Sequence, residues 1–281
     1  MRVVILPTEV EASNFAGQFI TDYINNNKNP VVGLATGGSV LLTYEALINH
    51  FKNGKLSFKN TTTFNLDEYI GLPPNHIQSY RNYMNQKLFD HIDIDSNNVF
   101  IPECFDENFD SASSNYEANI AKHGGIGLQL LGVGSNGHIG FNEPTSSLQS
   151  RTRVKTLTKN TLSKNARFFK PHENQPSLAL TMGIGTIMEA KNILLIGLGK
   201  HKSKAVADVV EGPLSAFCPG SALQNHLNAT IVLDKLAASD LKLYLKVEDA
   251  ILSLNFLFRD SLNKVTLFKF TIKRLFVLML E

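Results

Sequence analysis

The chain has 281 residues, of which 43% are hydrophobic and 19% are charged, and its formal net charge is +2. This composition excludes a disordered, collagen-like or long coiled-coil chain, and so small a charge gives no support for nucleic acid as a partner. The two cysteines, Cys104 and Cys218, lie far apart without a metal-binding or disulfide spacing, so a reducing, cytoplasmic location is expected.

Short apolar segments alternate with segments of helical periodicity, the pattern of a parallel sheet covered by helices. Strands are expected at residues 3–6, 31–35, 61–66, 128–133, 193–198 and 229–233. Helices are expected near residues 15–24, 42–51, 79–90 and 203–210. The acidic, serine-rich segment 106–114 is expected to be a surface loop, and segment 170–177, with two prolines, part of a mobile cover. The predicted fold class is α/β, a doubly wound parallel sheet with helices on both faces.

The segment 241–281 differs from the rest of the chain because it is both basic and very apolar. Its apolar runs are shorter than the roughly 18 residues that cross a bilayer, so no membrane span is expected. The chain is therefore divided into an α/β domain at 1–240 and a tail at 241–281. We expect the tail to pack against this chain or a partner subunit, with a membrane-surface helix as the alternative.

A glycine-containing loop follows the second expected strand. It consists of Thr36, Gly37, Gly38 and Ser39 and leads directly into a helix. Adjacent glycines let backbone N–H groups approach an anion, and the helix begins with its positive end there. The loop is a candidate phosphate site, with a tight strand-to-helix turn as the alternative.

Two adjacent carboxylates, Asp67 and Glu68, follow the third expected strand. Neighbouring residues of an extended chain point to opposite sides. One carboxylate is therefore expected to face the site while the other caps or orients it. The alternative is a helix that begins at Asp67 with Glu68 in its first turn.

The segment 132–144 after the fourth expected strand is the most specific of these loops. It reads GVGSNGHIGFNEP, so four glycines surround His138, and Glu143 follows five residues later. Glycines contribute no side chains to a core, so the segment favours a proton-transfer role for His138 over a structural one. Glu143 is close enough to pair with His138 or with the same substrate.

Five motifs in order resemble the glucosamine-6-phosphate deaminases, which convert glucosamine 6-phosphate and water into fructose 6-phosphate and ammonium. They are LDEYIGL at 66–72, GHIGFNEP at 137–144, SRTR at 150–153, NARFF at 165–169 and ALT at 179–181. The resemblance runs from the amino terminus to about Leu241. It implies a Rossmann-like sheet with a lid, here at about 155–183, and neither a metal nor an organic cofactor.

The resemblance also implies roles for individual residues. Asp67 is the base that moves a proton between C2 and C1 of the open-chain sugar. His138 opens the pyranose ring, oriented by Glu143 and Asn136. The substrate and phosphate candidates are Thr36, Gly37, Gly38, Ser39, Glu68, Arg167 and Lys202.

Some family members are hexamers activated by N-acetylglucosamine 6-phosphate. The residues that match their activator site are Ser146, Arg153, Lys155 and Thr156, whereas Val247 stands where those members have an aromatic residue. Asn136 stands where part of the family has aspartate, so an altered pH dependence is expected. A monomer and a homo-oligomer, including a hexamer, both remain open at this point.

Two other functions are weighed against the deaminase. A 6-phosphogluconolactonase has a similar scaffold and histidine loop, but the residues 66–69 and 142–144 favour the deaminase. A non-catalytic sugar-phosphate sensor would keep the phosphate loop and lose the acid–base groups, yet Asp67, His138 and Glu143 are all present.

Overall fold

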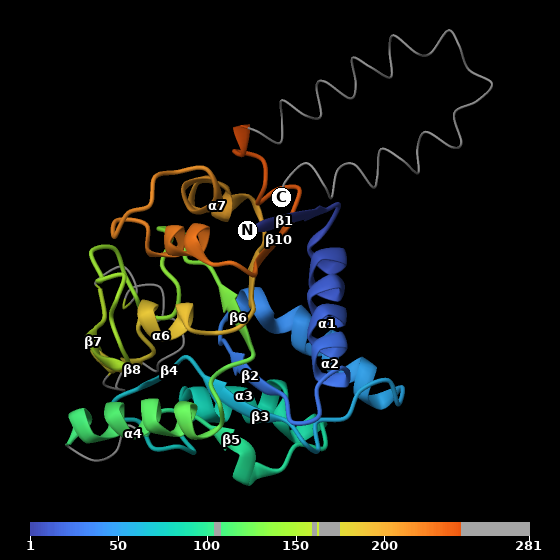
Figure 1. Ribbon diagram of the computed structural model, residues 1–281, viewed down its shortest axis with the longest axis vertical. Coiled ribbons are helices and arrows are strands. Elements are labelled where there is room, and N and C mark those ends of the chain that lie inside the picture. Colours follow the sequence, from blue (N-terminus) through green and yellow to red (C-terminus); the bar gives the residue numbers. More distant parts are fainter. Residues whose placement is uncertain (104–107, 159–161, 163–174, 243–281) are drawn as a thin grey trace, which may run out of the picture.

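A seven-stranded parallel sheet forms the centre of the computed structural model, which describes residues 1–103, 108–158, 162 and 175–242 (Figure 1). The strand order is β1-β10-β9-β6-β2-β3-β5. The strands are β1 (Arg2–Leu6), β2 (Val31–Leu34), β3 (Thr62–Asn65), β5 (Val99–Phe100), β6 (Leu128–Gly132), β9 (Ile193–Gly197) and β10 (Ala229–Asp234). The central strands β2, β9 and β10 are buried along their whole length, as expected for apolar strands that are covered on both faces. The predicted fold class is confirmed.

Helices pack around this sheet, and four of them lie where the periodic segments predicted them. The helices are α1 (Glu9–Asn25), α2 (Leu41–Lys52), α3 (Tyr80–Lys87), α4 (Phe109–Lys122), α6 (Ile184–Met188) and α7 (Ser203–Val210). Short 3-10 helices are η1 (Gly38–Val40), η2 (Phe89–His91), η3 (Ser96–Asn98), η4 (Lys200–Lys202) and η5 (Pro219–Asn225). Helices α1 and α2 lie side by side, and α1 packs on β1, β9 and β10 (Figure 1).

Helix α1 illustrates how the sequence specifies these helices. The Thr8 side chain accepts a hydrogen bond from the N–H of Glu11 and so caps the first turn. A stripe of buried residues recurs every four positions and faces the core: Ala12, Ala16, Ile20 and Ile24.

A second, three-stranded antiparallel sheet with the order β4-β8-β7 was not predicted. Its strands are β4 (Asp67–Tyr69), β8 (Leu178–Thr181) and β7 (Arg153–Thr156). The segment 67–69 was expected to be a loop, and this was wrong because Asp67 pairs with Thr181, far along the chain. Pairing partners so distant are invisible to local patterns.

The surface loop expected at 106–114 was also wrong from residue 109 onward. Helix α4 begins at Phe109, after the Asn108 side chain accepts a hydrogen bond from the N–H of Ser111. The helix buries Tyr116 and Ile120, one turn apart and both beyond the polar segment that suggested a loop.

Two expectations fall mainly outside the described residues. In the lid predicted at 155–183, residues 159–161 and 163–174 lie outside the described residues. In the tail predicted at 241–281, residues 243–281 lie outside them. Among the helices that the structure describes, none combines the length and the apolar character that crossing a bilayer requires.

The strand order brings four loops to one edge of the main sheet. Strands β9, β6, β2 and β3 are consecutive neighbours and all run parallel. Their carboxyl ends therefore meet at one edge, where open α/β sheets bind ligands.

Candidate active site

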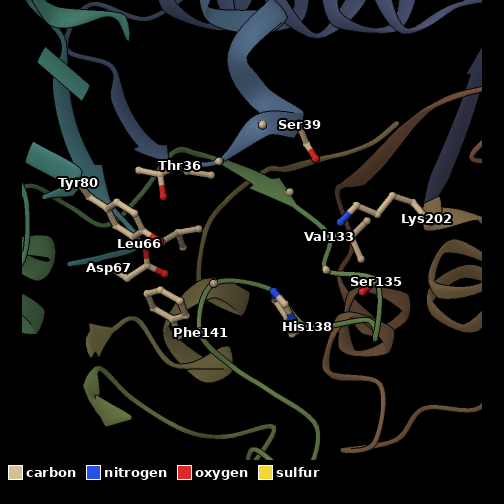
Figure 2. Close-up of a pocket in the computed structure, with 16 residues that line it drawn as sticks. Thr36, Ser39, Leu66, Asp67, Tyr80, Val133, Ser135, His138, Phe141 and Lys202 are labelled. Atoms are coloured by element: carbon tan, nitrogen blue, oxygen red, sulfur yellow. The ribbon is translucent and has the colours of Figure 1, made fainter. Parts of the chain in front are cut away.

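A pocket opens at this edge and is lined by all four loops (Figure 2). The described residues that line it are Ala35, Thr36, Gly37, Gly38, Ser39, Leu66, Asp67, Tyr80, Gly132, Val133, Gly134, Ser135, His138, Gly140, Phe141 and Lys202. The structure therefore brings together the glycine loop, the first of the two carboxylates and the histidine loop.

Asp67 is the buried acid of the pocket, with a relative exposure of 5%. The Thr181 hydroxyl donates to Oδ2 of Asp67 over 3.4 Å. Burial and the nearby charge of Glu68 raise the pKa of Asp67 to about 7, although hydrogen bonds from Thr181 and the Phe141 backbone oppose the shift. A carboxylate with this pKa is suited to act as a general base near neutral pH.

Close approach of the histidine loop to Asp67 requires a glycine at position 140. Gly140 has a φ of +55°, and a Cβ there would lie 3.3 Å from Oδ2 of Asp67 and 3.2 Å from Oγ1 of Thr181. The loop that carries His138 is thus seated directly against Asp67, and both side chains face the same pocket (Figure 2).

Glu68 does not line the pocket, in contrast to its expected role at the substrate. Its Oε1 accepts from the N–H groups of Tyr69 and Tyr80, both over 2.8 Å, and its Oε2 accepts from the N–H of Arg81 over 2.9 Å. The carboxylate therefore holds the first turn of α3, where the N–H groups of a helix lack partners. The prediction that one carboxylate faces the site while the other caps matches this arrangement.

Asn136, His138 and Glu143 form a hydrogen-bonded chain. Oδ1 of Asn136 lies 2.6 Å from Nδ1 of His138, and Nδ2 of Asn136 donates to Oε2 of Glu143 over 2.7 Å. Glu143 is buried and lies 3.5 Å from Nδ1 of His138. The chain orients the imidazole through its Nδ1, so Nε2 remains available for chemistry.

The His138 ring lies flat against the start of its own loop. A Cβ at Gly134 would be only 2.2 Å from Cε1 of the ring, so no other residue fits at that position. This contact gives a physical reason for one of the four glycines that the sequence places around the histidine.

The phosphate candidates in the described part of the chain lie in the same pocket. Residues 36–39 and Lys202 all line it, the lysine as the last residue of η4 after β9. Gly37 has a φ of +104°, a conformation that favours glycine. Arg167 lies outside the described residues.

Tyr80 and Thr181 were not assigned roles from the sequence. Tyr80 lines the pocket, and burial, with neighbouring Tyr69 and Asp67, raises the pKa of its hydroxyl well above the ordinary value. Its position at the start of α3, after the capping Ser79, is a local signal that could have been noticed. Thr181 contacts Asp67 across 114 residues, so no local signal exists.

The candidate activator residues lie away from this pocket. Arg153, Lys155 and Thr156 are on β7, and Ser146 is buried in the loop after Glu143. Burial lowers the pKa of Lys155, an effect that neighbouring Arg153 reinforces and Glu143 opposes. In the part of the chain that the structure describes, no three His, Cys, Asp or Glu side chains are grouped to hold a metal ion.

A parallel α/β sheet whose edge joins a buried carboxylate, an oriented imidazole and a glycine loop defines an enzyme of acid–base chemistry on a small anionic molecule. The family model described as "Glucosamine-6-phosphate isomerases/6-phosphogluconolactonase" matches residues 10–232. The chain belongs to this family.

Relatives and solved structures agree with this assignment. A glucosamine-6-phosphate deaminase of Colwellia psychrerythraea is 52% identical over 243 residues, which cover 86% of this chain and 91% of the relative. One of Shewanella woodyi is 52% identical over 241 residues, with the same coverage. A structure described as a monomeric glucosamine-6-phosphate deaminase matches with a TM-score of 0.83 and 43% identity, covering 85% of this chain and all of that one. A 6-phosphogluconolactonase from Trypanosoma cruzi shares the fold, with a TM-score of 0.66 at 19% identity.

Proposed function

We propose that this chain is a glucosamine-6-phosphate deaminase, which converts glucosamine 6-phosphate and water into fructose 6-phosphate and ammonium. The observation that carries the proposal is the convergence of buried Asp67 and oriented His138 on one pocket. The relatives that share about half of its residues have this name.

Ring opening is the first step and belongs to His138. The anomeric hydroxyl must lose a proton and the ring oxygen must gain one, which breaks the bond between C1 and the ring oxygen. An imidazole suits this task because it accepts and returns a proton near neutral pH. Asn136 holds the Nδ1 side of the ring, so the exchange takes place at Nε2.

Isomerisation is the second step and belongs to Asp67. The carboxylate removes the proton from C2 of the open-chain aldehyde, and the electron pair forms a C1–C2 double bond while the C1=O π bond opens and O1 takes a proton from the substrate's ammonium group. Asp67 then returns its proton to C1, and the lone pair of the amino nitrogen forms a protonated imine at C2. Water adds to this imine and ammonia leaves, so the ketose is formed. The buried position of Asp67 excludes bulk water and strengthens it as a base.

The phosphate provides binding energy remote from the reacting carbons. The glycine loop 36–39 and Lys202 are its proposed ligands, together with Arg167 from outside the described residues. Binding at this end holds the flexible open-chain sugar with C1 and C2 near the acid–base groups.

Ammonium release from glucosamine 6-phosphate, measured with fructose 6-phosphate formation, tests the proposal. We expect both products in equal amounts and a very poor rate with glucosamine, which lacks the phosphate. Equal rates with both sugars would contradict the phosphate site. Hydrolysis of 6-phosphogluconolactone, with no ammonium released from glucosamine 6-phosphate, would instead identify a lactonase. Lactone hydrolysis needs no base at C2.

The proposal extends to regulation by N-acetylglucosamine 6-phosphate at Ser146, Arg153, Lys155 and Thr156. Its support is the match of these four residues to the activator site of other family members, and three of them lie together on β7. Addition of this sugar phosphate is expected to lower the KM of the wild type and not of Lys155→Ala. Light scattering in the same buffer distinguishes a monomer from a homo-oligomer.

A further inference from the structure

Tyrosine hydroxyls hold two backbone carbonyl groups, one just before the glycine loop and one within it. The hydroxyl of Tyr44, on α2, donates to the carbonyl of Ala35, and the hydroxyl of Tyr83, on α3, donates to the carbonyl of Gly37 over 2.9 Å. Neither tyrosine lines the pocket, whereas Ala35 and Gly37 both do. Each of the two carbonyl groups therefore accepts a hydrogen bond from a side chain that lies outside the pocket.

The planarity of the peptide bond gives these contacts a consequence for the pocket. In a trans peptide the N–H of the next residue points opposite to the C=O, and no cis peptide occurs among the described residues. A Gly37 carbonyl directed at Tyr83 thus directs the N–H of Gly38 away from Tyr83, and Gly38 itself lines the pocket. Gly38 is also the first residue of η1, which continues into α2, so this N–H has no acceptor within the helix.

Helix α3 links this loop to the base. Tyr80 and Tyr83 are three residues apart and share a face of the helix. The Thr36 side chain hydrogen-bonds the Tyr80 hydroxyl, while Glu68 holds the N–H of Tyr80 over 2.8 Å. The loop and the strand that carries Asp67 are therefore attached to the same short helix.

We propose that Tyr83 is a positioning residue for phosphate binding: its hydroxyl holds the Gly37 carbonyl so that the N–H of Gly38 faces the phosphate. This rests on the proposed function, since it places the substrate phosphate at the glycine loop. Tyr83 acts through the backbone alone and does not touch the substrate. The role is distinct from those of Thr36, Ser39 and Lys202, whose side chains line the pocket.

The direct test compares Tyr83→Phe with Tyr23→Phe by calorimetric titration with inorganic phosphate. The Tyr23 hydroxyl hydrogen-bonds the backbone of Val31, at the opposite end of β2, so the control loses a hydrogen bond between a tyrosine and the backbone far from the loop. We expect phosphate affinity to fall about fivefold to tenfold in Tyr83→Phe and to stay unchanged in Tyr23→Phe. Equal affinity in Tyr83→Phe and the wild type, or no phosphate binding by the wild type, overturns the proposal.

A double-mutant cycle tests whether Tyr83 works through the N–H of Gly38. Gly38→Pro removes this N–H at a first helical position, where proline is tolerated, and Gly38→Ala keeps it. A Cβ at Gly38 meets no atom within 4 Å, so the alanine side chain fits. In the Gly38→Pro background we expect Tyr83→Phe to cause no further loss of phosphate affinity. In the Gly38→Ala background we expect Tyr83→Phe to weaken phosphate binding as it does in the wild type. Additive effects in both backgrounds overturn the proposal.

Turnover measurements separate this inference from the proposed function. With glucosamine 6-phosphate, Tyr83→Phe is expected to raise KM by about the same factor as the phosphate Kd and to change kcat less than about twofold. A fall in kcat at constant KM contradicts the positioning role. A wild type that binds phosphate but releases no ammonium refutes the proposed function and leaves the calorimetric result valid.

Discussion

The side-chain oxygen of Asn136 accepts from Nδ1 of His138 over 2.6 Å while its amide nitrogen donates to Glu143 over 2.7 Å. The opposite amide orientation would bring an oxygen against the Glu143 carboxylate, so the network determines the assignment. An acceptor at Nδ1 keeps the proton on that nitrogen, and Nε2 presents its lone pair to the pocket.

Replacing Asn136 by leucine therefore removes the group that selects this tautomer. We expect kcat/KM for glucosamine 6-phosphate to fall by about tenfold or more, because ring opening needs a free Nε2. Asn136→Asp keeps an oxygen at Nδ1 and should retain more activity, which steady-state kinetics of the two variants compares. A leucine variant as active as the wild type would show that Asn136 does not orient His138.

Asp67→Asn is expected to lower kcat by about 100-fold to 10,000-fold, the usual contribution of a general base. Binding of inorganic phosphate should hardly change, since the proposed phosphate ligands are the loop 36–39 and Lys202, and Asp67 is not one of them. In the wild type, kcat/KM should decline on the acid side with an apparent pKa of about 7, because the base must be ionised. A pH profile without a decline between pH 8 and about 5 would contradict this role.

The same substitution should stabilise the folded protein at neutral pH. The pKa of Asp67 is raised from 3.8 to about 7 on folding, so the native state binds the proton more tightly than the unfolded state. The protonated form stabilises the fold fully below pH 3.8, and this contribution is lost as the pH rises through about 7. Thermal unfolding should show a higher Tm for Asp67→Asn than for the wild type at pH 8 and a smaller difference at pH 5. A lower Tm for Asp67→Asn than for the wild type at pH 8 would show that the ionised Asp67 carboxylate does not destabilise the fold.

Glu117 contributes to stability in the opposite direction with pH. Its Oε1 accepts from the N–H and hydroxyl of Thr152 and from the hydroxyl of Thr186, and its Oε2 pairs with Arg151. Burial alone would raise the pKa of Glu117, but these hydrogen bonds and the Arg151 charge outweigh it and lower the pKa. The stabilisation is therefore present above the unfolded pKa and is lost as the pH falls through the lower folded value.

Glu117→Gln should accordingly reduce the free energy of unfolding by about 1–3 kcal/mol at pH 7 and by less at pH 4. Glu189→Gln is the matched control, because Glu189 also pairs with Arg151 but its side chain is 66% exposed. An exposed pair of this kind contributes about 0–1 kcal/mol. Urea unfolding measures both variants, and equal losses would show that the contacts of Glu117 with Thr152 and Thr186 have little weight.

The local patterns of the sequence predicted the main sheet well. All six expected strands are present, and three of them, β2, β9 and β10, are short apolar runs that are buried along their whole length. The missed strand β5 has only two residues, and the missed strands β4, β7 and β8 pair antiparallel across long sequence separations. A short strand with polar residues is stable only once its partner is in place, so its own composition contains little sign of it.

The sequence by itself indicated the chemical groups that we propose for the site. Asp67, His138, Asn136, Glu143 and the glycine loop were evident because they belong to uninterrupted motifs at the ends of apolar strands. Only the tertiary structure decided which way each group faces. It directs Asp67 into the pocket and Glu68 onto α3, adds Thr181 and Tyr80, and attaches Tyr83 to the glycine loop. The physical reason is that composition and spacing reflect burial, whereas a side chain's direction depends on hydrogen-bond partners that the chain supplies from distant elements.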